Sequence, residues 1–438
     1  MLTFQHLSGE NFRVKQRAEL IVLADEVVTC AGKGTPKNKD EAAQVGLISN
    51  GAVVLNDGRI TEVGSRHKIL QKWTGDRLEL ENTSVIPGLV DPHCHPIWAG
   101  DRKHEFALRA QGATYEEIHA AGGGIAHTVE ATRKASDKQL KSKTLEILEY
   151  MMAHGTTTLE AKSGYGLSVE EELRHLEILK KVNRESAMDL VSTCLGAHSI
   201  PPEFKDDRAG FVRLVTEEML PAVKEKGLAD FADVFCERGA FTCEESRQVL
   251  EAAKALGFGL RIHAEEFSNL GGSRMAGNLG AASCDHLQHI HEDDFQALKD
   301  GGTIPTVIPG TSFFLALDVY APARKLWDAG LPVALGTDYN AGSCLLPSMQ
   351  MAMSLAVLQM KMTPEEALTA ATYNAAHSLG WGHKIGSIEP GKQADLVVLN
   401  TSSWKDAIYR FGGNAVRAVI KKGVVLNTIL RSPLGAPL

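Results

Sequence analysis

Eight short apolar runs, separated by stretches with helical spacing, most strongly constrain how this chain can fold. Apolar residues recur at helical spacing between most of the runs, for example over residues 137–153, 168–182 and 243–256. Eight alternations of strand and helix predict an α/β fold in which parallel strands form a (β/α)8 barrel of the TIM type. The eight runs cover residues 85–95, 156–161, 190–198, 233–237, 259–265, 281–286, 303–308 and 332–338.

Histidines or carboxylates stand near the end of almost every run. The carboxyl-terminal ends of barrel strands meet at one face, where barrel enzymes place their chemistry. A strand end can be polar merely because it meets solvent, but repetition of this pattern along the chain favours an active site. The residues concerned are His93, His95, Glu160, Lys162, His198, Glu237, His263, His286 and Asp338.

Strand-like patterns also occupy both ends of the chain, outside the predicted barrel. Residues 20–28 form an apolar run, and residues 51–64 predict a hairpin around an Asn-Asp-Gly turn. Residues 385–399 and 416–426 repeat the strand-turn-strand pattern near the other end. We therefore expect both ends to form one small β-sandwich domain beside the barrel. The expected divisions are residues 1–85, 86–380 and 381–438.

Composition excludes several classes of function. The 438 residues carry a formal net charge of -8 without a basic cluster, which argues against a nucleic-acid surface. No apolar stretch approaches the length needed to span a membrane, and the start of the chain does not resemble a secretion signal. Seven dispersed cysteines fit reduced thiols better than a disulfide framework. These features predict a cytoplasmic protein.

The segment 91–95 reads Asp-Pro-His-Cys-His and indicates a metal site. Residues two apart on a strand point to the same face, so His93 and His95 can reach one ion. His263 and Asp338, at the ends of two other predicted strands, would complete a set of three imidazoles and one carboxylate. Such a set suits zinc or ferrous iron. We expect one divalent ion, Zn or Fe, per subunit, with an activated water as the nucleophile.

The same pattern argues against a second metal ion. The fourth predicted strand, residues 233–237, has no lysine that could be carbamylated to bridge two ions. Lys162 lies on the second strand instead. Cys94 stands between the two histidines, and strand alternation points its thiol away from the metal, so we expect it to pack rather than to bind.

Three further side chains are candidates for the chemical step. Asp338, if only loosely bound to the ion, could take the proton of the attacking water. Glu266, three residues after His263, could bond a ring nitrogen of the substrate or protonate a leaving amide nitrogen. His286 could polarise the carbonyl or orient the water. The alternative readings are a solvent-exposed loop glutamate and a buried histidine satisfied by its neighbours.

Longer motifs carry a family resemblance. Together they are similar to the amidohydrolase superfamily and, within it, to the imidazolonepropionase family, over residues 85 to the C-terminus. The segments that carry the resemblance are residues 87–95, 99–102, 122–125, 160–167, 195–198, 263–272, 285–286 and 336–343.

The resemblance implies metal-dependent hydrolysis of the cyclic amide bond of 4-imidazolone-5-propanoate, giving N-formimidoyl-L-glutamate in the third step of histidine degradation. It also implies a homodimer that binds this small molecule and neither nucleic acid nor membrane. The propanoate carboxylate suits the forked guanidinium of Arg102. Carried over position by position, the substrate-contacting residues are Arg102, Tyr115, Tyr165, His198, Glu266, Asn340, Gly342 and Ser343.

Two other functions remain open from the sequence. A single-metal deaminase of the cytosine or guanine type would share the histidines, the glutamate and the aspartate. Arg102 and Tyr165 argue against it, because a neutral base needs no carboxylate clamp. A non-catalytic scaffold on the same barrel is the second alternative. All four expected metal ligands are present, which argues against this reading.

Overall fold

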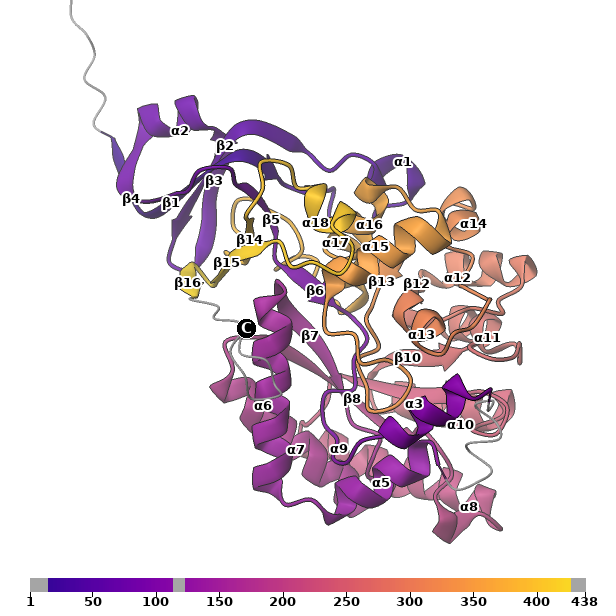
Figure 1. The fold of residues 1–438 in the computed structure, drawn as a ribbon. Coiled ribbons are helices and arrows are strands. Elements are labelled where there is room, and N and C mark those ends of the chain that lie inside the picture. Colours follow the sequence, from indigo (N-terminus) through magenta and orange to yellow (C-terminus); the bar gives the residue numbers. More distant parts are fainter. Residues whose placement is uncertain (1–14, 113–122, 427–438) are drawn as a thin grey trace, which may run out of the picture.

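The structure, a computed structural model, describes residues 15–112 and 123–426 and consists of a barrel beside a separate sheet (Figure 1). Eight parallel strands follow one another around the barrel in chain order, as the sequence predicts. Most strand residues are buried, because helices cover the outside and side chains fill the inside. The barrel strands are β6 (Leu89–Asp91), β7 (Thr156–Lys162), β8 (Asp189–Ala197), β9 (Phe231–Cys236), β10 (Gly259–Ala264), β11 (Ser283–His286), β12 (Ile304–Val307) and β13 (Ala334–Leu335).

The chain beyond β6 and β13 closes the barrel. The amide of Asp338 donates to the carbonyl of His93, and the amide of His95 donates to the carbonyl of Tyr339, each at 2.9 Å. Cys94 and Tyr339 form an isolated parallel bridge between these hydrogen bonds. Closure therefore places the segment that follows the last strand directly beside the His-Cys-His segment that follows the first.

The first predicted strand, residues 85–95, was wrong in its extent. It is two strands, because β5 (Ser84–Pro87) pairs with the small sheet and only β6 belongs to the barrel. Gly88 joins them, and a Cβ at this position would overlap the side chain of Thr157. Both halves are apolar and buried, so hydropathy alone could not show that the chain changes sheets here.

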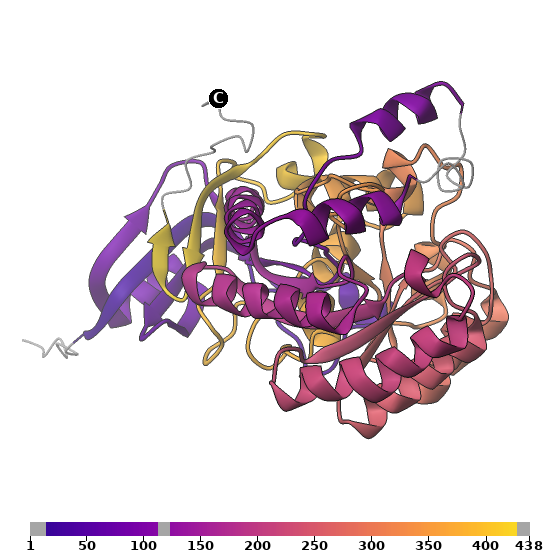
Figure 2. The same cartoon turned by 90° about the horizontal axis from the view of Figure 1, so that it is seen from below.

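Helices connect most of the barrel strands and cover its outer face (Figure 2). The predicted helix over residues 137–153 is confirmed with the same bounds, and Ser136 and Gln139 form a capping box at its start. The helices between and after the barrel strands are α3 (Lys103–Ala110), α5 (Ile125–Lys134), α6 (Asp137–Ala153), α7 (Val169–Glu185), α8 (Arg208–Arg213), α9 (Leu220–Glu225), α10 (Cys243–Ala255), α11 (Gly272–Leu279), α12 (Phe295–Gly301), α13 (Pro309–Phe314), α14 (Ala323–Asp328), α15 (Met349–Met360), α16 (Pro364–Ala370) and α17 (Tyr373–Ser378). Short helical turns add η1 (Pro202–Phe204), the π-helical η2 (Leu214–Met219) between α8 and α9, and η3 (Glu292–Asp294).

The second sheet is mixed and takes its strands from both ends of the chain, as expected (Figure 1). Its order is β16-β15-β14-β5-β1-β2-β3, and β4 also pairs with β1. The predicted Asn-Asp-Gly hairpin is confirmed, since Asp57 and Gly58 have φ values of 50° and 70° between β2 and β3. The strands are β1 (Gln16–Val28), β2 (Leu47–Asn56), β3 (Arg59–Ser65), β4 (Trp73–Glu79), β14 (Leu396–Leu399), β15 (Val416–Lys421) and β16 (Val424–Leu426), with helices α1 (Lys39–Ala42), α2 (Arg66–Lys72) and α18 (Asp406–Tyr409).

One strand prediction in this sheet was wrong. Residues 385–394 are turns rather than strand, and only β14 continues from them. Gly386 and Gly391 have left-handed φ values of 87° and 90°, which an extended strand does not accommodate.

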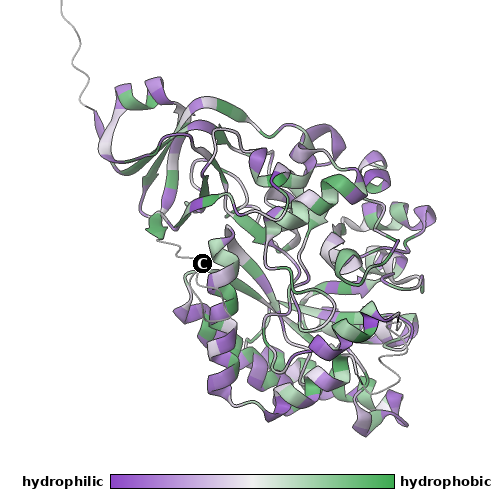
Figure 3. Cartoon of the chain, viewed as in Figure 1, coloured by the Kyte–Doolittle hydropathy of each residue, from purple (hydrophilic) through white to green (hydrophobic). Residues whose placement is uncertain are grey.

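The apolar residues follow these layers. Hydrophobic residues gather on the barrel strands and on the inner faces of the helices, while hydrophilic residues face outward (Figure 3). Among the helices of the described residues, none combines the length and apolar character needed to cross a membrane.

Candidate active site

A pocket opens at the carboxyl-terminal ends of the barrel strands, where the polar strand ends predict a site. It brings together side chains that lie up to 248 residues apart, from the segment after β6 to the segment after β13. Most of the predicted site residues meet here. The pocket is lined by His95, Arg102, Ile125, Tyr165, His198, Phe235, His263, Glu266, His286, Asp338, Asn340 and Ser343.

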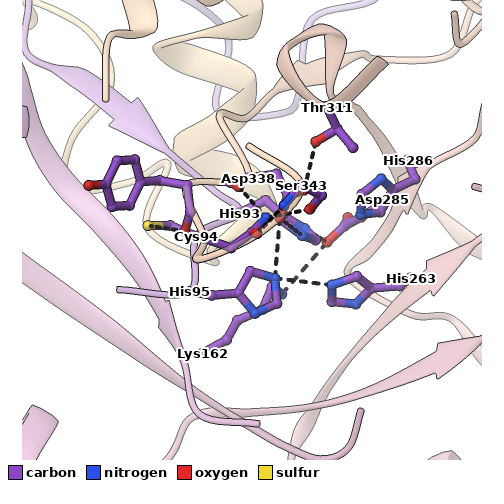
Figure 4. Close-up of polar contacts among 12 residues, drawn as sticks. His93, Cys94, His95, Lys162, His263, Asp285, His286, Thr311, Asp338 and Ser343 are labelled. Carbon is purple, nitrogen blue, oxygen red and sulfur yellow. Dashed lines mark hydrogen bonds and ion pairs between the residues drawn. The ribbon is translucent and has the colours of Figure 1, made fainter. Parts of the chain in front are cut away.

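His93 and His95 enter the site from the extended segment that follows β6, just beyond the strand itself. The expected alternation holds, because both imidazoles face the site and the Cys94 thiol turns away to the carbonyl of Tyr339, 3.6 Å distant (Figure 4). His93 and His95 are both buried. Because both side chains are buried, their neighbours restrict the orientation of the imidazole rings.

Asp338 links these histidines. Its Oδ1 lies 3.5 Å from His93 Nε2 and 3.3 Å from His95 Nε2, and its Oδ2 accepts a hydrogen bond of 2.6 Å from Thr311 (Figure 4). Burial opposes ionisation, but the adjacent imidazoles of His93 and His95 outweigh it and hold the pKa of Asp338 well below its usual value. Asp338 therefore presents a carboxylate to the cluster.

His263 and His286 complete the ring of histidines. His263 Nε2 lies 3.3 Å from His95 Nε2, so two nitrogens with the same position in the ring face each other. His93, His263 and His286 each offer a nitrogen, and the three atoms lie within 4.8 Å of one another. His93, His95 and Asp338 form a second group of this kind. His286, which we expected only as a catalytic residue, thus also lies within reach of an ion.

The donor set fits a divalent ion. Within the described part of the chain, His93 Nε2 is buried and has no hydrogen-bond partner, whereas its Nδ1 is 2.7 Å from Asp285 Oδ2. Asp233 holds His263 Nδ1 in the same way at 3.1 Å. Metal-binding histidines are commonly oriented by a carboxylate at the other ring nitrogen. Each Nε2 is thereby left facing the cluster, where a cation would satisfy it.

Lys162 does not contribute to this donor set. Its ammonium lies 2.8 Å from Glu160 Oε1 and 2.6 Å from Asp233 Oδ2. Burial disfavours the charge, but Asp233 and Glu160 outweigh burial and raise the pKa of Lys162 above its usual value. Lys162 is therefore a buried cation paired with two carboxylates.

Several site residues adopt left-handed backbone conformations that side chains rarely take. The φ values are 53° at Glu265, 82° at His286, 70° at Leu287 and 54° at Asp338. These residues lie at or just after the ends of barrel strands, where the chain turns away from the sheet. Strain of this kind concentrates at functional sites, since it aims side chains where an ordinary strand end would not.

Glu266 and His286 both line the pocket, and their pKa values are shifted in opposite directions. Their closest atoms, Glu266 Oε1 and His286 Nδ1, are 3.8 Å apart, and both residues are buried. Burial and the nearby carboxylates of Asp338 and Glu237 raise the pKa of Glu266 well above its usual value. Burial lowers the pKa of His286 to about 3. Burial therefore favours the neutral acid form of Glu266 and the neutral imidazole form of His286.

His198 and Tyr165 form the aromatic side of the pocket. The His198 ring stacks on His95 at 5.3 Å with an interplanar angle of 21°, and Tyr165 lies 5.3 Å from it. The carbonyl of Gly164 holds His198 Nδ1 at 2.9 Å. Burial lowers the pKa of His198 to about 3, so its ring is neutral and can bond a polar substrate atom through Nε2.

The loop of Asn340, Gly342 and Ser343 contributes Asn340 and Ser343 to the pocket lining. The Asn340 amide accepts from the backbone of Gly342 and Ser343, each at 2.8 Å, and donates to Ser343 Oγ at 2.7 Å. Arg102 packs so closely on this loop that a Cβ on Gly342 would overlap its guanidinium. Glu105 pairs with the same guanidinium at 2.7 Å. These contacts bring together Arg102, Gly342 and Ser343, three of the predicted substrate-contacting residues. Tyr115, which was also predicted to contact the substrate, lies outside the described residues.

Several supporting residues were not predicted. Asp233 and Asp285 orient two histidines, Thr311 holds Asp338, and Glu105 holds Arg102. Asp285 directly precedes His286 at the end of an apolar run, and this carboxylate beside a predicted site residue was the available signal in the sequence. Nothing local marked Thr311 or Glu105.

Comparison with known proteins finds relatives along most of the chain. The family model described as "Amidohydrolase family" matches residues 84–426. An imidazolonepropionase from Geobacillus kaustophilus (strain HTA426) is 47% identical over 410 residues, covering 92% of this chain and 96% of the relative. An imidazolonepropionase from Alkaliphilus oremlandii (strain OhILAs) is 43% identical over 404 residues, again with 92% and 96% coverage.

Solved structures share the fold at low identity. Guanine deaminase from E. coli has a TM-score of 0.69 and 16% identity, with 93% of this chain and 99% of that chain covered. A variant of atrazine chlorohydrolase from Arthrobacter aurescens TC1, complexed with zinc and atraton, has a TM-score of 0.70 and 15% identity, with 93% and 95% covered. These likenesses establish the architecture of barrel and sheet.

Proposed function

The chain belongs to the imidazolonepropionase family of amidohydrolases, and from this premise we propose that it hydrolyses 4-imidazolone-5-propanoate to N-formimidoyl-L-glutamate, the third step of histidine degradation. Relatives of that name match 92% of the chain at 43% to 47% identity. The observation that carries the proposal is one pocket that is lined both by Arg102 and by a cluster of histidines with Asp338. An anionic ring amide requires both features.

We propose His93, His95, His263 and Asp338 as the residues that hold one divalent ion, with zinc or ferrous iron as the candidates. Three neutral imidazoles and a carboxylate suit both ions. Bound there, the ion would acidify a water and polarise the carbonyl that the water attacks. His286 lies close enough to serve the ion or the substrate carbonyl, and we assign it to the carbonyl because Glu266 stands beside it.

Different side chains around the proposed metal site accept and donate protons. Asp338 is held as a carboxylate, so it accepts the proton of the attacking water. Glu266 is held as a neutral acid, so it can donate a proton to the ring nitrogen when the amide bond breaks. His286 is neutral and can donate a hydrogen bond to the developing oxyanion. These roles follow because the pKa of Asp338 is lowered and that of Glu266 is raised within one pocket.

Binding of the propanoate chain of the substrate would position its imidazolone ring in this pocket. Arg102 offers a forked guanidinium to the propanoate carboxylate, and Ser343 adds a hydroxyl donor from the neighbouring loop. Tyr165 and His198 line the aromatic side and can bond the polar atoms of the ring. The net charge of the chain is -8, so this local cation, rather than the overall field, would attract the anionic substrate.

The first test is turnover of freshly prepared 4-imidazolone-5-propanoate by protein of measured metal content, followed by the loss of its ultraviolet absorbance. We expect rapid loss with formation of N-formimidoyl-L-glutamate, abolition by a chelator, and recovery when zinc or ferrous iron is restored. Lack of turnover by metal-loaded protein would contradict the proposal. Release of ammonia from aminated bases would then favour a deaminase.

We further propose a cytoplasmic homodimer. All seven cysteines are free, and six of them are buried, as expected for a reducing compartment. The dimer rests on the family resemblance. Light scattering on the purified protein would measure its mass directly, and a mass of one chain would contradict this part of the proposal.

A further inference from the structure

A network of five charged side chains fills the barrel interior beneath the histidine cluster. It comprises three carboxylates and two cations from four strands, and each is at most 1% exposed. Charged groups are rarely buried so completely, because desolvation costs several kcal/mol unless each charge is paired. The members are Glu160 and Lys162 on β7, Asp233 on β9, Arg261 on β10 and Asp285 on β11.

The network is connected through Glu160. Lys162 Nζ lies 2.8 Å from Glu160 Oε1 and 2.6 Å from Asp233 Oδ2. Arg261 Nε lies 3.0 Å from the same Glu160 oxygen, and its Nη2 lies 3.3 Å from Asp285 Oδ2. Arg261 is fixed further by backbone carbonyls, including that of Pro92 at 2.7 Å, which directly precedes His93. Lys162 therefore joins Glu160 most closely to Asp233, with Asp285 Oδ2 farther away at 3.8 Å, and Arg261 joins Glu160 to Asp285.

Both arms of the network end on a proposed metal ligand. Asp233 Oδ1 lies 3.1 Å from His263 Nδ1, and Asp285 Oδ2 lies 2.7 Å from His93 Nδ1. A carboxylate is only an acceptor, so it requires a proton on the Nδ1 that faces it. The Nε2 of each ring is then left without a proton and points into the cluster (Figure 4).

We propose that Lys162 is a positioning residue of the metal site: it anchors the Asp233 carboxylate, so that His263 presents an unprotonated Nε2 to the ion. Arg261 does the same for Asp285 and His93. This inference rests on the proposed metal-dependent function. It assigns to the barrel interior the task of fixing the tautomers of two ligands from different strands.

The balance of charge supports this reading. Three carboxylates against two cations leave one surplus negative charge in the network, and Asp338 adds a second at the site. The imidazole ligands are neutral when they bind a metal. A divalent cation would offset this surplus.

Removal of the Lys162 charge distinguishes positioning from a simple field effect. If Lys162 acted only as a nearby positive charge, its loss would strengthen the binding of a dication. If it positions Asp233, its loss leaves that carboxylate free to turn, and the ligand His263 loses its orientation. The two explanations predict opposite signs.

The experiment compares Lys162→Met with the wild type by titrating metal-free protein with Co²⁺ against a chromophoric chelator, and by recording the visible spectrum of bound Co²⁺. Lys421→Met is the matched control, since Lys421 is also a buried lysine between two aspartates, Asp189 and Asp395, at 2.8 and 2.7 Å, but lies in the other sheet. Asp233→Asn provides a second variant of nearly unchanged shape.

We expect Lys162→Met and Asp233→Asn to bind Co²⁺ about 10- to 100-fold more weakly, with altered visible bands, and Lys421→Met to retain the wild-type affinity and spectrum. Unchanged or tighter binding by folded Lys162→Met would overturn the inference. If that variant does not fold, wild-type affinity in Asp233→Asn would overturn it. A wild type that binds no Co²⁺ would overturn the proposed metal site as well, whereas tight wild-type binding with unaffected variants would overturn the positioning role alone.

Discussion

The carboxylate of Glu105 holds the guanidinium of Arg102 through two of its nitrogens, with Oε2 lying 2.8 Å from Nε and 2.7 Å from Nη2. Both residues are buried, and the other carboxylate oxygen of Glu105 accepts from the amide of Gly124 at 2.8 Å. Because the guanidinium is planar, holding two of its nitrogens fixes the orientation of the whole group. The remaining nitrogen, Nη1, lies against Gly342, on the side of the pocket.

Arg102→Lys should weaken substrate binding although it keeps the charge. A lysine cannot reproduce both contacts to Glu105 while it faces the substrate carboxylate, so we expect KM to rise about 10- to 100-fold, and further in Arg102→Ala. Steady-state kinetics measures this. A neutral imidazolone without the propanoate chain is the control, because its hydrolysis should be equally slow in wild type and variants. A matching loss with that analogue would show that Arg102 does not recognise the carboxylate.

Gly342→Ala should produce the same defect without removing any charged group. An added methyl would overlap the guanidinium of Arg102, which must then leave its plane. We expect KM to rise at least about tenfold, since misplacing a charged hydrogen bond costs 1.5 kcal/mol or more. Gly64→Ala in β3 is the matched control, because a methyl there meets Ile69 at an ordinary 3.8 Å. Equal kinetics in the two variants would contradict the proposed packing.

Glu266→Gln and His286→Ala should mainly slow the chemical step. Neither removes the carboxylate clamp, so KM should change little, while kcat should fall about 10²- to 10⁴-fold through loss of proton transfer or carbonyl polarisation. Pre-steady-state measurement of ring opening separates this step from product release. The assignment of roles fails if both variants lose substrate affinity and keep the turnover number.

In the profile of activity against pH, the decline on the alkaline side should come from Glu266. Its pKa is raised by burial, Asp338 and Glu237, and the protonated form is the proposed acid, so activity should fall as the pH rises through that pKa. His286, with a pKa lowered to about 3, stays neutral above that pH and adds no limb there. Glu266→Gln should abolish the alkaline limb in the residual activity. An identical limb in that variant would assign it to another group.

Asp189→Asn should destabilise the contact between barrel and sheet. Asp189, on β8, pairs with Lys421 at 2.8 Å and Lys422 at 2.7 Å across this contact. Burial opposes ionisation, but the two lysines and Gln393 outweigh it and lower the pKa of Asp189 from 3.8 to about 2. The ionised group therefore contributes about 2 kcal/mol of stability above pH 4, and this is lost as the pH falls through 2.

Urea unfolding at several pH values tests this linkage. At pH 7 the variant should unfold about 2 kcal/mol more easily than the wild type. The difference should shrink as the pH approaches 2, where the wild-type carboxyl also becomes neutral. A difference independent of pH would assign the loss to packing rather than to charge.

The sequence by itself determined the repeating order of strands and helices and the kinds of residue at the strand ends. Helix α6 was predicted with its observed bounds, and the Asn-Asp-Gly hairpin was placed correctly, because periodicity, capping and turn chemistry are local properties. The same locality explains why His93 and His95 could be recognised as a pair that shares a face.

Tertiary structure alone decided which of these residues meet. Barrel closure sets Asp338 beside His93 and His95 through backbone hydrogen bonds between segments almost 250 residues apart. Pairing of Asp233 with His263 depends on the register of the neighbouring strands β9 and β10, whereas Asp285 on β11 meets His93 from a strand that is not adjacent to β6. The change of sheet at Gly88 depends on contacts with Thr157. Such relationships are set by packing and register across the whole barrel, which no local pattern records.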